Sequence, residues 1–121
     1  MSYNINYTDE FEYVKAIING KWPENSAEMH KSILASCKGH AIPKLLIDVE
    51  GLEDNPTPLQ DFNTIKLMQK LGYEKIHKIA VYDKLKNKNA NDIFEGLAFN
   101  TNLKMRFFYN EQDALNFLLN K

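Results

Sequence analysis

Acidic side chains at one point of the chain are the residues best suited to chemistry. Asp48, Glu50, Glu53 and Asp54 follow one another closely, and Asp61 comes soon after them. Carboxylate oxygens are the ligands that Ca²⁺ and Mg²⁺ prefer in proteins. The spacing of these residues matches no calcium-binding loop, however, and an acidic residue near the end of a strand usually meets solvent. We therefore expect a solvated acidic turn, with Asp48 where the chain meets solvent, and no metal site.

Two of the histidines and the only cysteine form a second group with ligand chemistry. Cys37 and His40 are close in sequence, but Gly39 predicts that a helix ends between them, and His30 lies about two turns earlier. No second pair at metal-binding spacing occurs elsewhere. We predict no metal ion and no cofactor. Cys37 is expected to be an inert core residue, because a buried free cysteine behaves as a small hydrophobic side chain.

Motifs of nucleophilic catalysis and nucleotide binding are missing from the sequence. No Gly-x-Ser-x-Gly segment occurs, neither Ser32 nor Ser36 follows a predicted strand, and the glycines are too scattered for a phosphate-binding loop. Lys84, Lys86 and Lys88 lack the interleaved aromatic residues that a nucleic-acid platform needs. The formal net charge of −1 gives no overall attraction to nucleic acid. We predict no catalytic residues, no enzymatic activity and no nucleic-acid partner.

Thr57 is the hydroxyl residue in the most specific setting. Pro58 suits the first position of a helix and Gln60 stands where a capping box needs it. Capping explains the threonine by itself. The alternative is a regulatory site, because a phosphate at a helix N-terminus adds roughly two negative charges beside the helix dipole and remodels a partner surface. The acidic residues nearby would repel such a phosphate.

The segment from Lys44 to Gly72 predicts the elements that position these residues. Residues 45–49 form a short apolar run, interrupted by one acid, that is typical of a strand covered on both faces. Apolar residues then recur every three positions, as on one face of a helix: Leu59, Phe62, Ile65, Met68 and Leu71. Strand, loop and capped helix form a βα unit, and ligands and partners dock at such loops in open α/β sheets.

The remaining segments extend this unit into one α/β domain over residues 1–121. We expect strands over 4–8, 11–18, 77–82 and 103–108, and helices that begin near residues 25, 91 and 110. In the helix near residue 91, Ile93, Phe94 and Leu97 are expected to face inward. The order is ββαβαβαβα, with an N-terminal antiparallel hairpin strand at the edge of a mostly parallel sheet and crossover helices between the other strands.

The composition is that of a soluble globular protein, with 44% hydrophobic and 26% charged residues. A single cysteine permits no intrachain disulfide, which favours a reducing compartment. The first residues lack the basic and apolar regions of a signal peptide, and no apolar run approaches the roughly 20 residues that span a membrane. We expect a cytoplasmic protein with no membrane span.

Four segments together resemble the STAS domain, in the branch similar to bacterial anti-sigma-factor antagonists (SpoIIAA-like), most members of which are uncharacterised. They are the strand end Ile17–Gly20 with the helix after it, the central strand and turn Lys44–Leu52, the strand Lys78–Val81, and Phe108 with Ala114–Leu118. The likeness covers nearly the whole chain. It implies a single STAS-like domain that is not an enzyme and acts by binding a protein or a small ligand.

The resemblance also implies a kind of partner. Known antagonists of this family carry an Asp-Ser pair at the start of the helix after the central strand, and a partner kinase phosphorylates the serine. Here the corresponding turn reads Asp54-Asn-Pro-Thr57-Pro-Leu, so the pair is missing and Thr57 is the nearest hydroxyl. A kinase or an anti-sigma-like regulator is the protein partner that the resemblance suggests.

We therefore expect a STAS-like regulatory module that binds a protein partner at the loop and helix start after the central strand. The residues expected there are Asp48, Glu50, Glu53, Asp54, Thr57 and Gln60. The alternative is a binding protein for a small molecule, a lipid or a nucleotide, in a pocket between sheet and helices walled by Phe62, Met68, Phe94 and Phe99. Homodimerisation through the hairpin edge or the helices stays open.

Overall fold

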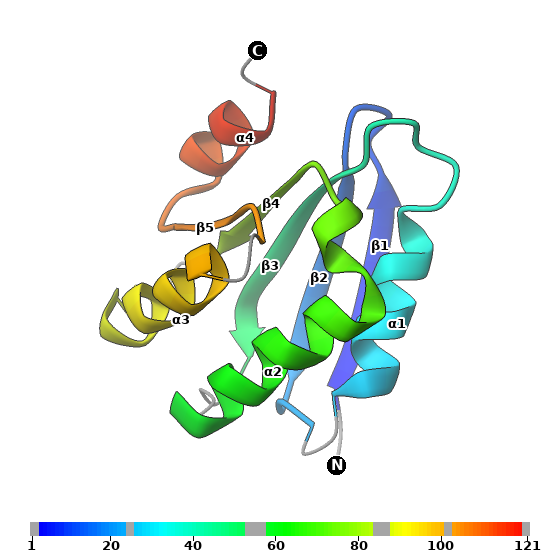
Figure 1. Cartoon of the computed structure of the whole chain (residues 1–121). Helices are drawn as coiled ribbons and strands as arrows, with labels where there is room; N and C mark the ends of the chain where they lie inside the picture. The colour runs from blue at the N-terminus through cyan, green and yellow to red at the C-terminus, as the bar shows by residue number, and fades with distance from the viewer. Residues whose placement is uncertain (1–2, 24–25, 53–57, 84–87, 101–102, 120–121) are drawn as a thin grey trace.

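The computed structural model shows a five-stranded sheet with helices on both faces (Figure 1). It describes residues 3–23, 26–52, 58–83, 88–100 and 103–119, and for 58–62, 88–90 and 100 it describes the backbone alone. The strands lie side by side in chain order: β1 (Tyr3–Asp9), β2 (Val14–Gly20), β3 (Lys44–Leu52), β4 (Lys78–Tyr82) and β5 (Met105–Phe108). β1 pairs antiparallel with β2, and every other pairing is parallel.

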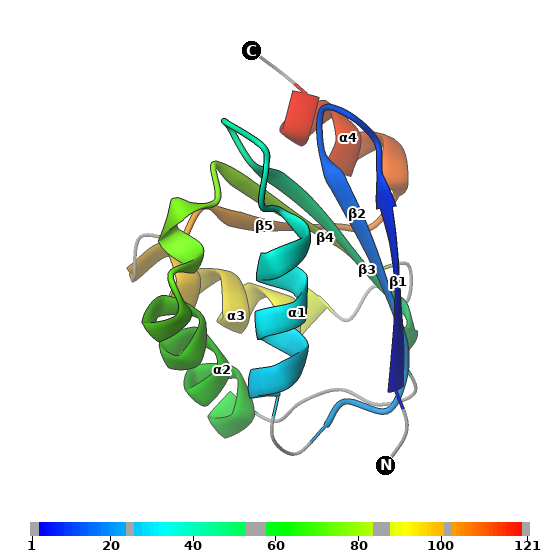
Figure 2. The same ribbon diagram turned by 90° about the vertical axis from the view of Figure 1, so that its right-hand side faces the viewer.

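The helices are divided unequally between the two faces of the sheet. Helices α1 (Ala27–Ser36), α2 (Pro58–Leu71) and α3 (Lys88–Asn100) cover one face, and α4 (Glu111–Leu119) covers the other (Figure 2). A 3₁₀ turn, Tyr73–Lys75, follows α2. The order ββαβαβαβα confirms the predicted fold class, including the antiparallel hairpin at one edge of a mostly parallel sheet.

Alternation along β3 explains how one strand contributes to both layers. Leu45 and Ile47 belong to the core under α1–α3, whereas Leu46 belongs to the core under α4. Leu45 and Leu46 are both 0% exposed. Because successive strand residues point to opposite faces, a strand covered on both sides is apolar at successive positions. The apolar run predicted as a central strand is therefore confirmed.

Local signals mark the ends of two helices. Gly72 has a φ of 97° directly after α2, a left-handed conformation that glycine adopts without steric cost. At the start of α4, the Oδ1 atom of Asn110 accepts the backbone N–H of Asp113 at 2.8 Å and caps the helix, whose start near residue 110 was predicted. Glu111 and Asp113 also place negative charge in the positive first turn of this helix.

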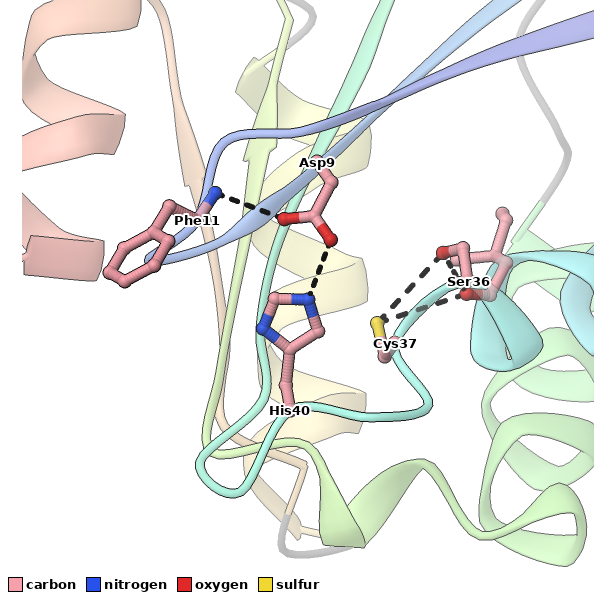
Figure 3. Close-up of polar contacts among 6 residues, drawn as sticks. Asp9, Phe11, Ser36, Cys37 and His40 are labelled. Carbon is pink, nitrogen blue, oxygen red and sulfur yellow. Dashed lines mark hydrogen bonds and ion pairs between the residues drawn. The ribbon is translucent and has the colours of Figure 1, made fainter.

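The expectation that Phe11 begins the second strand is wrong. Phe11 lies in the turn before β2, is 89% exposed and has a φ of 75°. The Asp9 carboxylate accepts the Phe11 N–H at 3.0 Å (Figure 3), and the Glu10 N–H donates to the Tyr13 carbonyl at 2.9 Å. These two hydrogen bonds close a four-residue turn, so local polar contacts determine the backbone here and the apolar ring is left in solvent.

The expectation that Ile93 faces inward is also wrong, because 47% of its surface is exposed. Asn91 and Ala98 are buried on α3, and Phe94 is partly buried between them in sequence. Their spacing of three and four residues defines the face of the helix that meets the core. Leu97 lies beside this face and is partly buried, as predicted.

Candidate functional site

The carboxyl end of β3 carries two of the acidic residues that the sequence singles out. Asp48 is 4% exposed, so the expectation that it meets solvent is wrong. The reason is that β3 continues to Leu52, which places Asp48 inside the strand, opposite Tyr82 of β4. Its Oδ1 atom accepts the backbone N–H of Glu50 at 3.1 Å. Glu50 is exposed and presents its carboxylate to solvent at this edge.

An ion pair close to Asp48 joins β2 to the start of α4. The Lys15 Nζ atom donates to the Glu111 Oε2 atom at 2.7 Å, and this hydrogen bond raises the pKa of the lysine. Burial raises the pKa of Asp48, and burial also raises the pKa of Tyr82 beside the acidic residues. Three acidic residues, Asp48, Glu50 and Glu111, lie here beside one basic residue, Lys15. The carboxyl end of β3 is therefore locally negative, although the whole chain is nearly neutral.

The structure describes only part of the remaining residues that were predicted for the partner surface. Glu53, Asp54 and Thr57 lie outside the described residues. Helix α2 begins at Pro58, as predicted, and Gln60 lies in its first turn with a side chain outside the description. The structure thus brings Asp48 and Glu50 together at one strand end, and capping by Thr57 stays a prediction.

A cavity of about 80 Å³ lies on the opposite face, between the sheet and helices α1–α3. Its wall is mainly apolar and includes Ile18, Ile47, Met68 and Phe94. The polar residues in the wall are His30, Thr64, Asp83 and Asn91, all of which are buried. The Asn91 side-chain amide donates to the Asp83 Oδ2 atom at 3.0 Å.

His30 is the residue in this wall whose role the sequence analysis missed. It is 3% exposed, and neither ring nitrogen has a hydrogen-bond partner among the described residues. The rings of Trp22 and Tyr73 lie edge-on to the imidazole, with centroids 5.9 and 5.8 Å away. Burial lowers the pKa of His30 to about 4, so the ring is neutral at pH 7. The Tyr73 hydroxyl donates to the backbone carbonyl of His30 at 2.9 Å and leaves the ring nitrogens unpaired.

The sequence contained a signal for the burial of His30. Counted along α1, the histidine comes three residues before Ile33 and seven before Cys37, and such spacing places all three side chains on one face of a helix. Both apolar neighbours are buried in the core. The sequence analysis weighed His30 as a metal ligand and gave too little weight to this apolar stripe.

The predicted apolar pocket is only partly assembled. Met68 and Phe94 line the cavity, whereas Phe99 is 82% exposed and borders an open hollow beside β5. Phe62 lies in α2, and its side chain is outside the description. A volume of about 80 Å³ is well below the roughly 300–1,000 Å³ of ordinary ligand sites. The cavity among the described residues is therefore too small for a lipid or a nucleotide.

The residues weighed as transition-metal ligands do not converge. His40 Nε2 lies 3.1 Å from Asp9 Oδ2, on a loop that approaches the β1–β2 turn (Figure 3). Cys37 is 5% exposed, its thiol donates to the Ile33 carbonyl at 3.8 Å, and burial raises the pKa of the thiol. Its predicted place in the core is confirmed. Within the described ranges, no group of three or more His, Cys, Asp and Glu side chains could hold a metal ion.

Comparison with solved structures identifies the fold. The chain is similar to an anti-sigma factor antagonist from Mycobacterium paratuberculosis, with 18% sequence identity and a TM-score of 0.67 over 97% of this chain and 94% of that one. It is also similar to an uncharacterised protein of the DUF3478 family with a SpoIIAA-like fold from Shewanella loihica PV-4, with 19% identity, a TM-score of 0.64 and the same coverage. The fold is SpoIIAA-like.

The SpoIIAA-like fold confirms the likeness that the sequence predicted. No protein-family model matches the sequence. No curated protein matches it either. Among the described residues, no helix has both the length and the apolar character needed to cross a membrane.

Proposed function

We propose that this SpoIIAA-like protein is a regulatory module without enzymatic activity, and that it binds a protein partner at the end of β3 and the start of α2. One observation supports the proposal above all others. The fold agrees over 97% of the chain with that of a protein named as an anti-sigma factor antagonist, which is a name for action on another protein. The proposed surface comprises Asp48, Glu50, Glu53, Asp54, Thr57 and Gln60.

The described part of this surface gives its residues different roles. Glu50 is exposed and contacts the partner directly, whereas Asp48 is buried and holds the strand end through its bond to the Glu50 N–H. The ion pair between Lys15 of β2 and Glu111 of α4 connects the sheet to α4 close to this strand end. It therefore helps to hold in place the end of β3 that carries the exposed Glu50 carboxylate. The local excess of negative charge favours a partner with a basic surface, because complementary charge speeds encounter and selects partners.

Thr57 is the proposed point of control within this surface. A phosphate on its hydroxyl would add roughly two negative charges at the N-terminus of α2, next to an edge that is already acidic. Phosphorylation by a partner kinase would therefore alter binding of a basic surface through charge. A mass increase mapped to Thr57 in protein from its own host would support this control, and an unmodified Thr57 in bound and unbound protein would exclude it.

Site-specific photocrosslinking in the native host would identify the partner. A benzophenone amino acid at position 50 would sample the proposed surface, and the same group at position 74 would serve as the matched control. Glu74 is an equally acidic, exposed residue in the turn before β4, at the end of that strand opposite to the proposed surface. We expect one dominant crosslinked protein from position 50 that is missing from position 74. Identical products from both positions would contradict the proposal.

A further inference from the structure

The surroundings of His30 indicate a binding site inside the protein. We infer that the cavity between the sheet and helices α1–α3 binds a small neutral compound with a hydroxyl group, and that the His30 imidazole is its hydrogen-bond partner. This site is distinct from the acidic edge at the end of β3, because it lies on the other face of the sheet. The inference does not depend on a protein partner.

The unpaired imidazole is the first argument for a guest. A neutral imidazole has one nitrogen that donates a hydrogen bond and one that accepts. Both nitrogens of His30 are buried, and neither is paired within the described residues. Most buried polar side-chain atoms have a partner in the protein or an ordered molecule. The nearest rings, Trp22 and Tyr73, approach edge-on, and the Tyr73 hydroxyl donates to the backbone of His30.

The charge of the wall determines the chemical class of the guest. His30 is neutral at pH 7 and does not attract an anion, and the Asp83 carboxylate repels one. Apolar side chains such as Ile18 and Met68 dominate the rest of the wall, and an ion would lose its hydration there. A hydroxyl group both donates and accepts, so it can pair with whichever nitrogen of the neutral imidazole it reaches, the donor or the acceptor.

The volume limits the guest to a compact molecule. About 80 Å³ corresponds to roughly three water molecules at about 30 Å³ each. An apolar cavity of about 150 Å³ holds benzene, so a guest here is smaller than that ring. A three-carbon alcohol fits these limits. Val49 and Leu52 also line the cavity, so the guest would contact the end of β3 from inside.

A matched pair of probes tests the inference in the wild-type protein. 2-Propanol and propane share a three-carbon skeleton and differ by the hydroxyl group. Each is titrated into the isotope-labelled full chain at pH 7, while NMR follows the Met68 methyl group and the His30 ring nitrogens. We expect saturable shifts at both residues with 2-propanol, and at least tenfold tighter binding of 2-propanol than of propane. Equal affinities would overturn the inference, because the imidazole would then make no hydrogen bond to the guest. No saturable shift of the Met68 methyl group would also overturn it, because the cavity would then be a dry void or hold water alone.

Substitution of the histidine supplies a second readout. His30→Leu removes both ring nitrogens and is expected to weaken 2-propanol binding at least tenfold while propane binding stays within twofold. His77→Leu is the matched control, because His77 is exposed in the loop before β4 and does not line the cavity. It should leave both affinities unchanged. Undiminished 2-propanol binding by folded His30→Leu protein would contradict the role of the imidazole. The wild-type probe pair decides the question if this variant does not fold.

Discussion

Asp48 and His30 are polar residues buried on opposite faces of the sheet, and they differ in their hydrogen bonding. On the α4 face, the buried carboxylate of Asp48 accepts a backbone N–H, and the Lys15–Glu111 ion pair lies nearby. On the face under α1–α3, the imidazole of His30 lies in an apolar wall with no partner among the described residues. Burial of a polar group is costly unless a hydrogen bond compensates for the lost water. The hydrogen-bonded carboxylate of Asp48 therefore stabilises the fold, whereas the unpaired imidazole of His30 indicates a site for a bound molecule.

The largest expected effect that separates the two faces is a loss of stability in acid caused by His30. Burial lowers the pKa of His30 from the ordinary 6.5 to about 4. Between these two pH values, the folded protein therefore binds fewer protons than the unfolded chain. This contribution to stability is complete above pH 6.5 and is lost as the pH falls through about 4. The loss is about 3 kcal/mol. Urea unfolding at pH 7 and pH 4 would show it as a decrease that is larger in wild type than in His30→Leu. Equal decreases would mean that the imidazole is already paired or exposed.

His30→Leu should also change stability at neutral pH. Removing a buried, unpaired polar group and keeping a similar volume is expected to raise the free energy of unfolding by about 1–2 kcal/mol in the absence of a guest. Chemical denaturation of both proteins at pH 7 measures this difference. Destabilisation by a comparable amount would show that the ring nitrogens have a hydrogen-bond partner, and the contrast between the two faces would then disappear.

Substitutions of Asp48 are expected to separate charge from hydrogen bonding on the α4 face. Asp48→Asn keeps an oxygen that can accept the Glu50 N–H, whereas Asp48→Leu leaves that N–H without its acceptor. The leucine variant should be less stable than the asparagine variant by about 1–2 kcal/mol. Because burial raises the pKa of Asp48, its contribution should favour the folded state below the ordinary pKa of 3.8 and diminish as the pH rises, opposite to His30. Denaturation curves of the variants at several pH values test both statements.

The Lys15–Glu111 ion pair should have the smallest effect. Its side chains are 21% and 41% exposed, so water and salt screen their attraction. A double-mutant cycle with Lys15→Met and Glu111→Gln should give a coupling energy of about 0.5 kcal/mol that decreases in high salt. A coupling energy several times larger that does not change with salt would show that the ion pair is shielded from solvent and stabilises the packing of α4 on the sheet.

Much of the fold was predictable because its signals are local. The apolar run in β3 and the apolar spacing in α2 each depend on neighbouring residues, and Gly72 directly follows the end of α2. The burial of Asp48 was not predictable in this way. β3 continues past it because Asn19 and Gly20 of β2 pair with Gly51 and Leu52, and this contact joins segments far apart in sequence.

The candidate sites show the same limit. A Cβ atom at position 51 would clash with the Asn19 side chain, which would have to move, so close strand packing favours glycine there, a reason that the sequence alone does not reveal. The cavity depends likewise on the meeting of α1, α2, α3 and the sheet. The periodicity of α1 placed His30 on the core face, but it could not show that no group from the other elements would meet the ring.

The affinity of the crosslinked partner for two charge-reversal variants tests the proposed function most directly. Glu50→Lys reverses a charge on the proposed surface, and Glu74→Lys makes the same change in an exposed turn away from it. With the purified partner in a calorimetric titration, Glu50→Lys should weaken binding at least tenfold, and Glu74→Lys should leave it within twofold of wild type. Equal affinities for the two variants would contradict binding at the end of β3.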